Sequence, residues 1–425
     1  MGARSLKHMQ RSAHDDSGDM LFMVSVMGAV MFLLVTSLIA VAVWQQNTAS
    51  VRTRSSQAMA VADAGINAYL YQLRQNNQYY ASNPDSGWVS MGADGSYRVL
   101  ATAPTSSSPL TLRSIGNSHN ASMTVVCTVG FPTFADYMFL VDTDMTIGSA
   151  ATITGNVRSN GTVTNSGHVA GQVMYANSFV NQGGTVDLGA TRTATVDFSQ
   201  VLADMADIET SATASGTYYP ALGGTYQGYL VTLNNTQATV AKITGGAQSG
   251  TLGNLTTTGA ITVNIPSSGV FFFDDPDGVY VKGTYSKAVT IASSSSIYVA
   301  GNYLKANAAG TYSAGLIGQV NVMIPTAWST TYLPTNMTIN AAMLAQSGAC
   351  TADLSNGTLK TSLTINGAIA SEGQANYVSG SSHGFASRSY VYDRNLQTFA
   401  PPMFPNTGST GALHVNSWVE GTPVG

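Results

Sequence analysis

The feature that most constrains this chain is an uncharged, apolar run near its N-terminus. No charged residue occurs between Met20 and Val51, and the part from Met20 to Trp44 is dense in Met, Leu, Val, Ile, Phe and Ala. About 20 apolar residues suffice for a helix to cross a bilayer, where a helix satisfies its own backbone hydrogen bonds. The run therefore predicts a single membrane-spanning helix.

The helical pattern continues beyond the apolar run. After Arg52 and Arg54, apolar residues recur at alternating steps of three and four and draw one stripe along a helix. The stripe consists of Met59, Ala62, Ile66, Tyr69 and Leu73. We therefore expect one unbroken helix over residues 20–74, roughly 55 residues and on the order of 80 Å long at 1.5 Å per residue. Its second, amphipathic half must lie against a folded domain.

The composition limits what that domain can be. Only 9% of the residues are charged, against roughly 25% in an average globular domain, and there are 43 glycines among the 425 residues. Such a chain favours an extracellular, mostly β protein over a cytosolic enzyme. The net charge of −4 argues against nucleic acid as a partner, since nucleic acid demands a basic face.

Turn-forming residues end the helix near Arg74, and short strands follow. The segments 97–101, 110–112 and 123–129 have strand composition, and the last alternates apolar and polar residues. We expect them to form a small α/β neck over residues 75–135, in which antiparallel strands bury the stripe of the helix.

From residue 136 to 425 the sequence pattern changes to short segments rich in β-branched residues, separated by Gly and Asn. This pattern is typical of a β-solenoid, in which each coil relies on its neighbours. Because no strict period is visible, we expect an irregular right-handed β-helix, with a helical insertion near residues 197–209. The predicted fold is thus a long N-terminal helix and a mostly β head.

The first 19 residues form a short polar leader with three basic residues, Arg4, Lys7 and Arg11. The positive-inside tendency predicts that residues 1–19 stay in the cytoplasm, although Arg52 and Arg54 on the far side weaken the signal. The alternative is a secretory signal peptide. Its apolar region would be only 7 to 15 residues long, which favours the retained anchor.

The leader, the span and the segment 57–70 (QAMAVADAGINAYL) together resemble a type IV pilin-like, PilX-like subunit. The succession of strands and turns from Val270 to Ala370 resembles the C-terminal β-helical region of large proteins of that family. The resemblance implies cleavage by a prepilin peptidase after Gly18, so that Asp19 becomes the first residue. It also implies other pilin-like subunits as partners. Met23 stands where pilins usually carry a Glu, five residues after the cut.

Residues that could carry chemistry are few. Asp274, Asp275 and Asp277 could ligate Ca²⁺ through hard carboxylate oxygens. Asp-Pro-Asp-Gly is also an ordinary turn between strands, and we favour the turn. The six His show no zinc spacing, and no phosphate-binding loop occurs. We therefore predict no enzyme activity and no cofactor.

The two cysteines, Cys127 and Cys350, both fall in the part expected outside the cell, where disulfides persist. A bridge between them would close a loop of about 220 residues and contribute roughly 4 to 5 kcal/mol on the chain-entropy model. Two buried free thiols are an equal alternative, because the sequence does not place their Cα atoms within bonding range.

Two functions remain open at this point. The first is a pilin-like minor subunit or pilus assembly protein in the cytoplasmic membrane, which displays its head at the cell surface or pilus tip for assembly or adhesion. The second is a membrane-anchored surface β-helix that binds or cleaves surface glycans. For the second, a cluster of four residues could line a cleft, but a polar C-terminal loop is the simpler interpretation: His383, Arg388, Tyr392 and Asp393.

Overall fold

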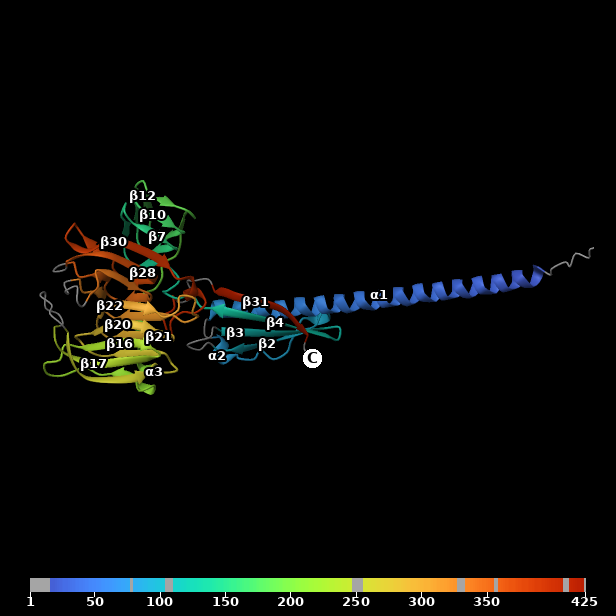
Figure 1. Cartoon of the computed structure of the whole chain (residues 1–425), viewed down its shortest axis with the longest axis horizontal. Helices are drawn as coiled ribbons and strands as arrows, with labels where there is room; N and C mark the ends of the chain where they lie inside the picture. The colour runs from blue at the N-terminus through green and yellow to red at the C-terminus, as the bar shows by residue number, and fades with distance from the viewer. Residues whose placement is uncertain are drawn as a thin grey trace, which may run out of the picture.

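The computed structural model describes residues 16–76, 79–103, 110–246, 255–326, 333–354, 358–407 and 413–423. A long helix extends from a β-rich body made of two parts, a small sheet beside the helix and a large solenoid beyond it (Figure 1). The predicted fold class, a long N-terminal helix followed by a mostly β head, is confirmed.

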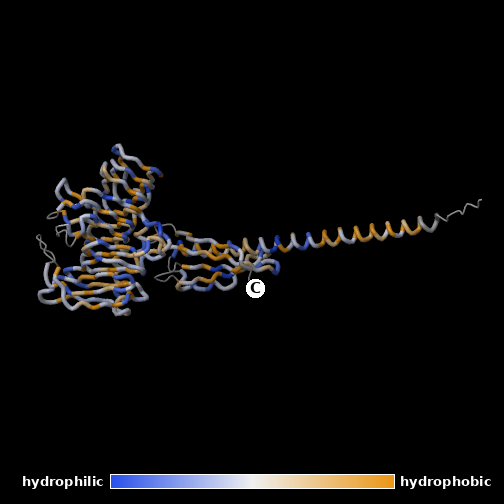
Figure 2. Tube along the Cα trace, viewed as in Figure 1, coloured by the Kyte–Doolittle hydropathy of each residue, from blue (hydrophilic) through white to orange (hydrophobic). Residues whose placement is uncertain are grey.

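Helix α1 runs without a break over Asp16–Gln75, 60 residues in all. It confirms the prediction of one continuous helix over residues 20–74 and begins one turn earlier. The free part of α1 consists largely of hydrophobic residues, and more hydrophilic residues appear as the helix approaches the sheet (Figure 2). The two halves of α1 therefore have different surroundings.

The small sheet, which we call the neck, is antiparallel and has the order β1-β2-β3-β4-β31. Its first four strands are β1 (Val89–Ser90), β2 (Ser96–Thr102), β3 (Leu110–Ser118) and β4 (Ala121–Gly130). The short helix α2 (Tyr79–Ser82) lies between α1 and β1, and the turn η1 (Gly92–Asp94) lies between β1 and β2. One face of the sheet packs against α1, and together they enclose a hydrophobic cluster of their own.

The fifth neck strand corrects the predicted domain boundary. Strand β31 (His414–Pro423) pairs with β4 along most of its length, so the chain returns from the solenoid to the neck. The prediction that residues 136–425 form the solenoid is therefore wrong for the last strand. Trp418 explains the return, because its side chain packs against the hydrophobic cluster of the neck.

The solenoid is built from parallel ladders of short strands. One ladder contains β14 (Ala190–Arg192), β11 (Val173–Tyr175), β8 (Val157–Ser159), β5 (Phe139–Val141), β28 (Leu359–Ser371), β26 (Ala342–Ala345), β23 (Ala314–Gly318), β21 (Val289–Ser293), β19 (Val270–Phe273) and β15 (Tyr218–Tyr219).

A second ladder contains β13 (Thr185–Val186), β10 (His168–Ala170), β7 (Thr152–Thr154), β30 (His383–Tyr392), β28, β25 (Asn336–Ile339), β22 (Ile297–Lys305), β20 (Val279–Tyr285) and β16 (Tyr229–Asn235). Strands β17 (Gln237–Gly245) and β18 (Thr256–Asn264) extend it as antiparallel strands, and β29 (Val378–Ser379) pairs antiparallel with β30. Shorter ladders are formed by β6 (Met145–Ile147), β9 (Val163–Asn165) and β12 (Phe179–Asn181), and by β24 (Val322–Ile324) and β27 (Cys350–Ala352) beside β22.

The order of the coils along the solenoid differs from their order in the sequence. The first solenoid strand, β5, pairs with β28, with Phe139 opposite Ile369. The chain thus enters the solenoid in its middle and builds coils outward to β12 and β14. It then resumes at the other end with β15 and β16 and returns to the middle through β30 (Figure 1). Helix α3 (Gln200–Ala214), near the predicted insertion at 197–209, lies on this crossover.

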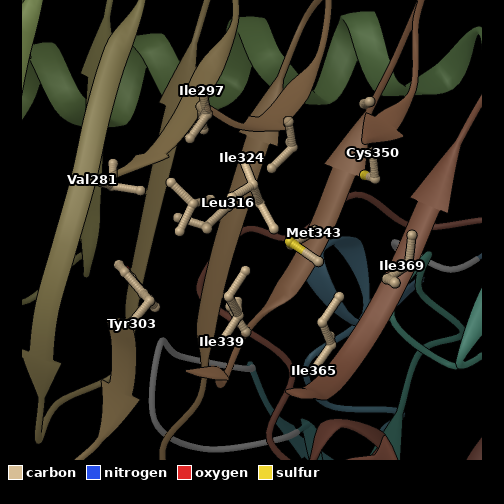
Figure 3. Close-up of a cluster of buried hydrophobic side chains, with 14 of the residues drawn as sticks. Val281, Ile297, Tyr303, Leu316, Ile324, Ile339, Met343, Cys350, Ile365 and Ile369 are labelled. Atoms are coloured by element: carbon tan, nitrogen blue, oxygen red, sulfur yellow. The ribbon is translucent and has the colours of Figure 1, made fainter. Parts of the chain in front are cut away.

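The solenoid core consists of aliphatic and aromatic side chains from successive coils. In Figure 3, side chains from neighbouring strands point toward one another, among them Leu316, Met343 and Ile369, and each of these is at most 1% exposed. A second cluster lies between the solenoid and α3, where Val201, Met205 and Ile208 are buried. Because each coil contributes few side chains, the stability of a coil depends on its neighbours.

Candidate functional site

The first half of α1 is an exposed apolar cylinder. Between Met20 and Trp44 the large hydrophobic side chains are 45% to 75% exposed, although burial of such groups from water is strongly favourable. This is the one helix among the described residues that is long and apolar enough to cross a membrane. It fits a single-pass anchor near the N-terminus.

The second half of α1 is seated on the neck sheet. The predicted stripe is buried, with Ala62 and Ile66 fully buried and Tyr69 and Leu73 at most 3% exposed, while Met59 is partly buried and packs at the edge of the same cluster. The helix and the sheet therefore form one body. The anchor passes into that body with no flexible linker.

Two glycines let the helix approach the sheet closely. A Cβ on Gly65 of α1 would lie 2.8 Å from the ring of Tyr97, and a Cβ on Gly116 of β3 would overlap backbone atoms of Ala58 and Ala62. Gly inside a helix lowers helix stability by up to about 1 kcal/mol relative to Ala. The close approach of helix and sheet explains why Gly occurs at these positions. Sequence reasoning missed Gly116. A glycine within a strand is itself a signal of close backbone approach.

An acidic pair lies at the junction of α1 and the C-terminal strand. The Asp63 carboxylate of α1 accepts a hydrogen bond from the side chain of Trp418 and faces Glu420, both on β31. Its Oδ1 is buried without a hydrogen-bond partner. Partial burial, and secondarily the negative charge of Glu420, raise the pKa of Asp63 above its usual value. This pair was not foreseen, since only the return of β31 brings Glu420 to the helix.

The residues predicted for processing lie at the start of α1. Gly18 and Asp19 fall within the first helical turns, and Met23 follows in the exposed apolar part at 75% exposure. Residues 1–15 of the predicted cytoplasmic leader lie outside the described residues. Met23 thus lies on the exposed surface of the helix.

Two of the three aspartates of the 274–278 turn hold the turn and connect it to neighbouring segments. Asp275 is 1% exposed and accepts hydrogen bonds from the backbone N–H groups of Leu222 and Asp277, at 2.7 and 3.0 Å. Asp274 accepts from the hydroxyls of Tyr218 and Ser294, at 2.9 and 2.8 Å. Among the described residues no cluster of three metal-ligating side chains occurs. The segment 274–278 thus forms a turn between β19 and β20.

The four C-terminal residues considered for a glycan cleft make mainly local contacts. Arg388 donates to the carbonyl of Phe385 at 2.6 Å, and His383 contacts Ser382. Asp393 caps the turn η2 (Arg394–Gln397) by accepting from the backbone N–H of Asn395, and it lies 3.6 Å from the ammonium of Lys305. The contact between Asp393 and Lys305 of β22 links the end of β30 to another coil, whereas the other contacts stay within residues 382–395.

The two cysteines are free thiols in separate hydrophobic clusters. Cys127 lies in β4 within the neck cluster, and Cys350 lies in β27 within the solenoid core. Burial raises the pKa of Cys127 to about 11 and also raises that of Cys350. Of the two alternatives left open by the sequence, the structure has the free thiols.

Comparisons with known proteins add little to this geometry. No family model and no curated protein matches the chain. One similar solved structure is the competence-associated pilin ComZ from Thermus thermophilus, with 13% identity and a TM-score of 0.34; the match covers 87% of this chain and 98% of that one. Another is the ice-binding protein from the Antarctic ascomycete Antarctomyces psychrotrophicus, with 12% identity, 61% and 96% coverage and a TM-score of 0.25. At such scores neither likeness carries an argument about function.

Proposed function

We propose that this chain is a pilin-like protein that is anchored in the cytoplasmic membrane by α1 and displays the solenoid outside the cell. The observation that carries the proposal is the division of α1. Its exposed apolar half has the length to span a bilayer. Its second half is part of the neck core through Ile66 and Leu73. A plain anchor needs no such rigid continuation into the folded head.

The finer assignment is a PilX-like minor subunit or pilus assembly protein that acts in assembly or adhesion. It rests on the sequence resemblance around Gly18 and residues 57–70. Its partners are then a prepilin peptidase and other pilin-like subunits. In such assemblies a Glu near the new N-terminus pairs with the terminal amine of a neighbour, a charge pair that a low-dielectric core strengthens. Met23 removes that pair, which suits a subunit with neighbours on one side only, at a tip or at initiation.

Processing at Gly18 tests the proposal. The full chain is co-expressed with a prepilin peptidase, and its N-terminus is determined by mass spectrometry. We expect loss of residues 1–18 from the wild type and an uncut Gly18→Val variant, with Gly28→Val as the matched control that is still cut. Gly28 lies in the same helix, and in the described part of the chain a Cβ there would meet nothing within 4 Å beyond its own stretch of helix.

An uncut wild-type chain in the membrane would overturn the filament role. The protein would then be a surface β-solenoid on a permanent anchor, the alternative that binds or cleaves surface glycans. Glycan arrays probed with the detergent-solubilised chain would address that alternative directly.

A further inference from the structure

Strand β18 (Thr256–Asn264) forms an open edge of the solenoid. Within the described part of the chain its one paired strand is β17, which lies on one side of it. Every residue of β18 is exposed except Val263, which is half-buried. The other side of β18 therefore presents backbone N–H and C=O groups that a further strand could pair with. This edge lies at the end of the solenoid opposite β12 (Figure 1).

The other open edges of the described sheets differ from β18. Strands β1, β6, β12, β13, β14, β15, β27 and β29 contain only two or three residues each. Strand β31 is long, but it carries the charged Glu420. Short length and charge are the usual means by which proteins prevent unwanted strand addition. Strand β18 has nine residues with no charge and no proline, and it is rich in β-branched side chains that favour pairing.

An apolar side chain accompanies the open edge. Ile261 of β18 lies opposite Val240 of β17, so the two side chains share one face of the sheet. Val240 is 4% exposed and belongs to the solenoid core, whereas Ile261 is 62% exposed. Ile261 thus extends the row of core-facing side chains by one strand beyond the buried Val240. A strand added beside β18 would cover Ile261 while it pairs with the backbone.

We propose that β18 is a dimerisation edge that pairs antiparallel with β18 of a second copy of this chain. A two-fold axis brings identical residues close together, and like charges placed opposite one another are destabilising. The sequence of β18 contains no charge that would oppose such self-pairing. The four residues Ile261–Asn264 pair regularly with Gln237–Val240, so they offer a straight segment for the new ladder. Two copies join as the sheet β16-β17-β18-β18-β17-β16, with both Ile261 side chains covered.

Sedimentation of the detergent-solubilised full chain tests the proposal. We expect a dimer for the wild type and an association at least about tenfold weaker for Ile261→Lys, because a charge on an open edge opposes strand addition. The matched control is Leu188→Lys, which changes an aliphatic residue that is 70% exposed near the opposite end of the solenoid. The control should remain a dimer. Circular dichroism and melting of both variants establish that they fold.

A second measurement separates this edge from contacts between the anchor helices. Thr262→Cys places a thiol on β18, whereas the native Cys127 and Cys350 are buried. We expect mild oxidation to link two copies through position 262 and not through Leu188→Cys. A monomeric wild type, a dimer that persists in Ile261→Lys, equal dissociation of both Lys variants, or absence of the link through position 262 would each overturn the proposal.

Discussion

Gly116 of β3 lies directly against the backbone of Ala58 in α1, with no side chain between the strand and the helix. A Cβ at Gly116 would overlap the Ala58 carbonyl oxygen and the Ala62 nitrogen. The anchor is thus held to the head by backbone contact as well as by the buried stripe. At this point the helix rests on the strand itself.

Replacing that glycine tests the seating of the helix. Gly116→Val should force α1 away from β3 and lower the free energy of unfolding of the neck by about 1–3 kcal/mol, the usual cost of overpacking. Urea unfolding followed by tryptophan fluorescence, to which Trp418 on the neck cluster contributes, measures the change. Gly223→Val is the control, because a Cβ at Gly223 meets nothing within 4 Å, and it should unfold as the wild type does.

The buried stripe predicts the effect of a charge. Ile66 is fully buried between helix and sheet, so Ile66→Asp should cost about 3 kcal/mol or more, as an uncompensated buried charge does. The same unfolding measurement applies. The control is Ala68→Asp, because Ala68 lies two residues after Ile66 but on the exposed face of α1. This variant should change the free energy of unfolding little. Equal unfolding curves for Ile66→Asp and wild type would show that the face is not buried.

The Asp63–Glu420 pair predicts a pH dependence of the neck. The pKa of Asp63 is raised in the folded state, so the folded neck holds this proton more tightly than the unfolded chain does. Stability should therefore fall as the pH rises from the usual Asp value of about 3.8 through the raised value. Asp63→Asn should reduce the difference in melting temperature between about pH 4 and about pH 7. Asp94→Asn, at an exposed site of η1, should leave the difference unchanged.

The cysteines predict a redox-insensitive protein. Because burial raises the pKa of Cys127 to about 11 and also raises that of Cys350, little thiolate forms at neutral pH. We expect neither thiol to be alkylated in the folded chain and both to be alkylated in denaturant without reductant. Non-reducing mass spectrometry reports the result. A linked Cys127–Cys350 peptide would contradict the free-thiol arrangement.

The place where the first solenoid strands meet the last ones predicts a position at which truncation of a side chain strongly lowers stability. Phe139 of β5 packs edge-on against Tyr390 of β30, with ring centroids 5.0 Å apart. Phe139→Ala should cost about 3–5 kcal/mol, because it opens a cavity where the two parts of the solenoid meet. Thermal unfolding measures the loss. Val180→Ala, at a position that is 43% exposed at the end of the solenoid, should have little effect.

The sequence by itself determined the elements whose cause is local. The uncharged run and the stripe from Met59 to Leu73 predicted α1, because a helix repeats every 3.6 residues and the period is visible in one segment. The alternation in 123–129 predicted β4 for the same reason, with period two. Residues 274–278 form a turn between β19 and β20, as their composition predicted, because the backbone preferences of Asp, Pro and Gly act within a few residues.

Only the tertiary structure decided which strands are neighbours. The β-branched segments of the solenoid resemble one another, so nothing local indicates that Phe139 pairs with Ile369 or that Val419 returns to β4 beside Val126. Those pairings depend on apolar surface buried between segments that lie hundreds of residues apart in the chain. The acidic pair Asp63–Glu420 and the free thiols follow from the same pairings. Their partners become known only once the ends of the chain are placed in space.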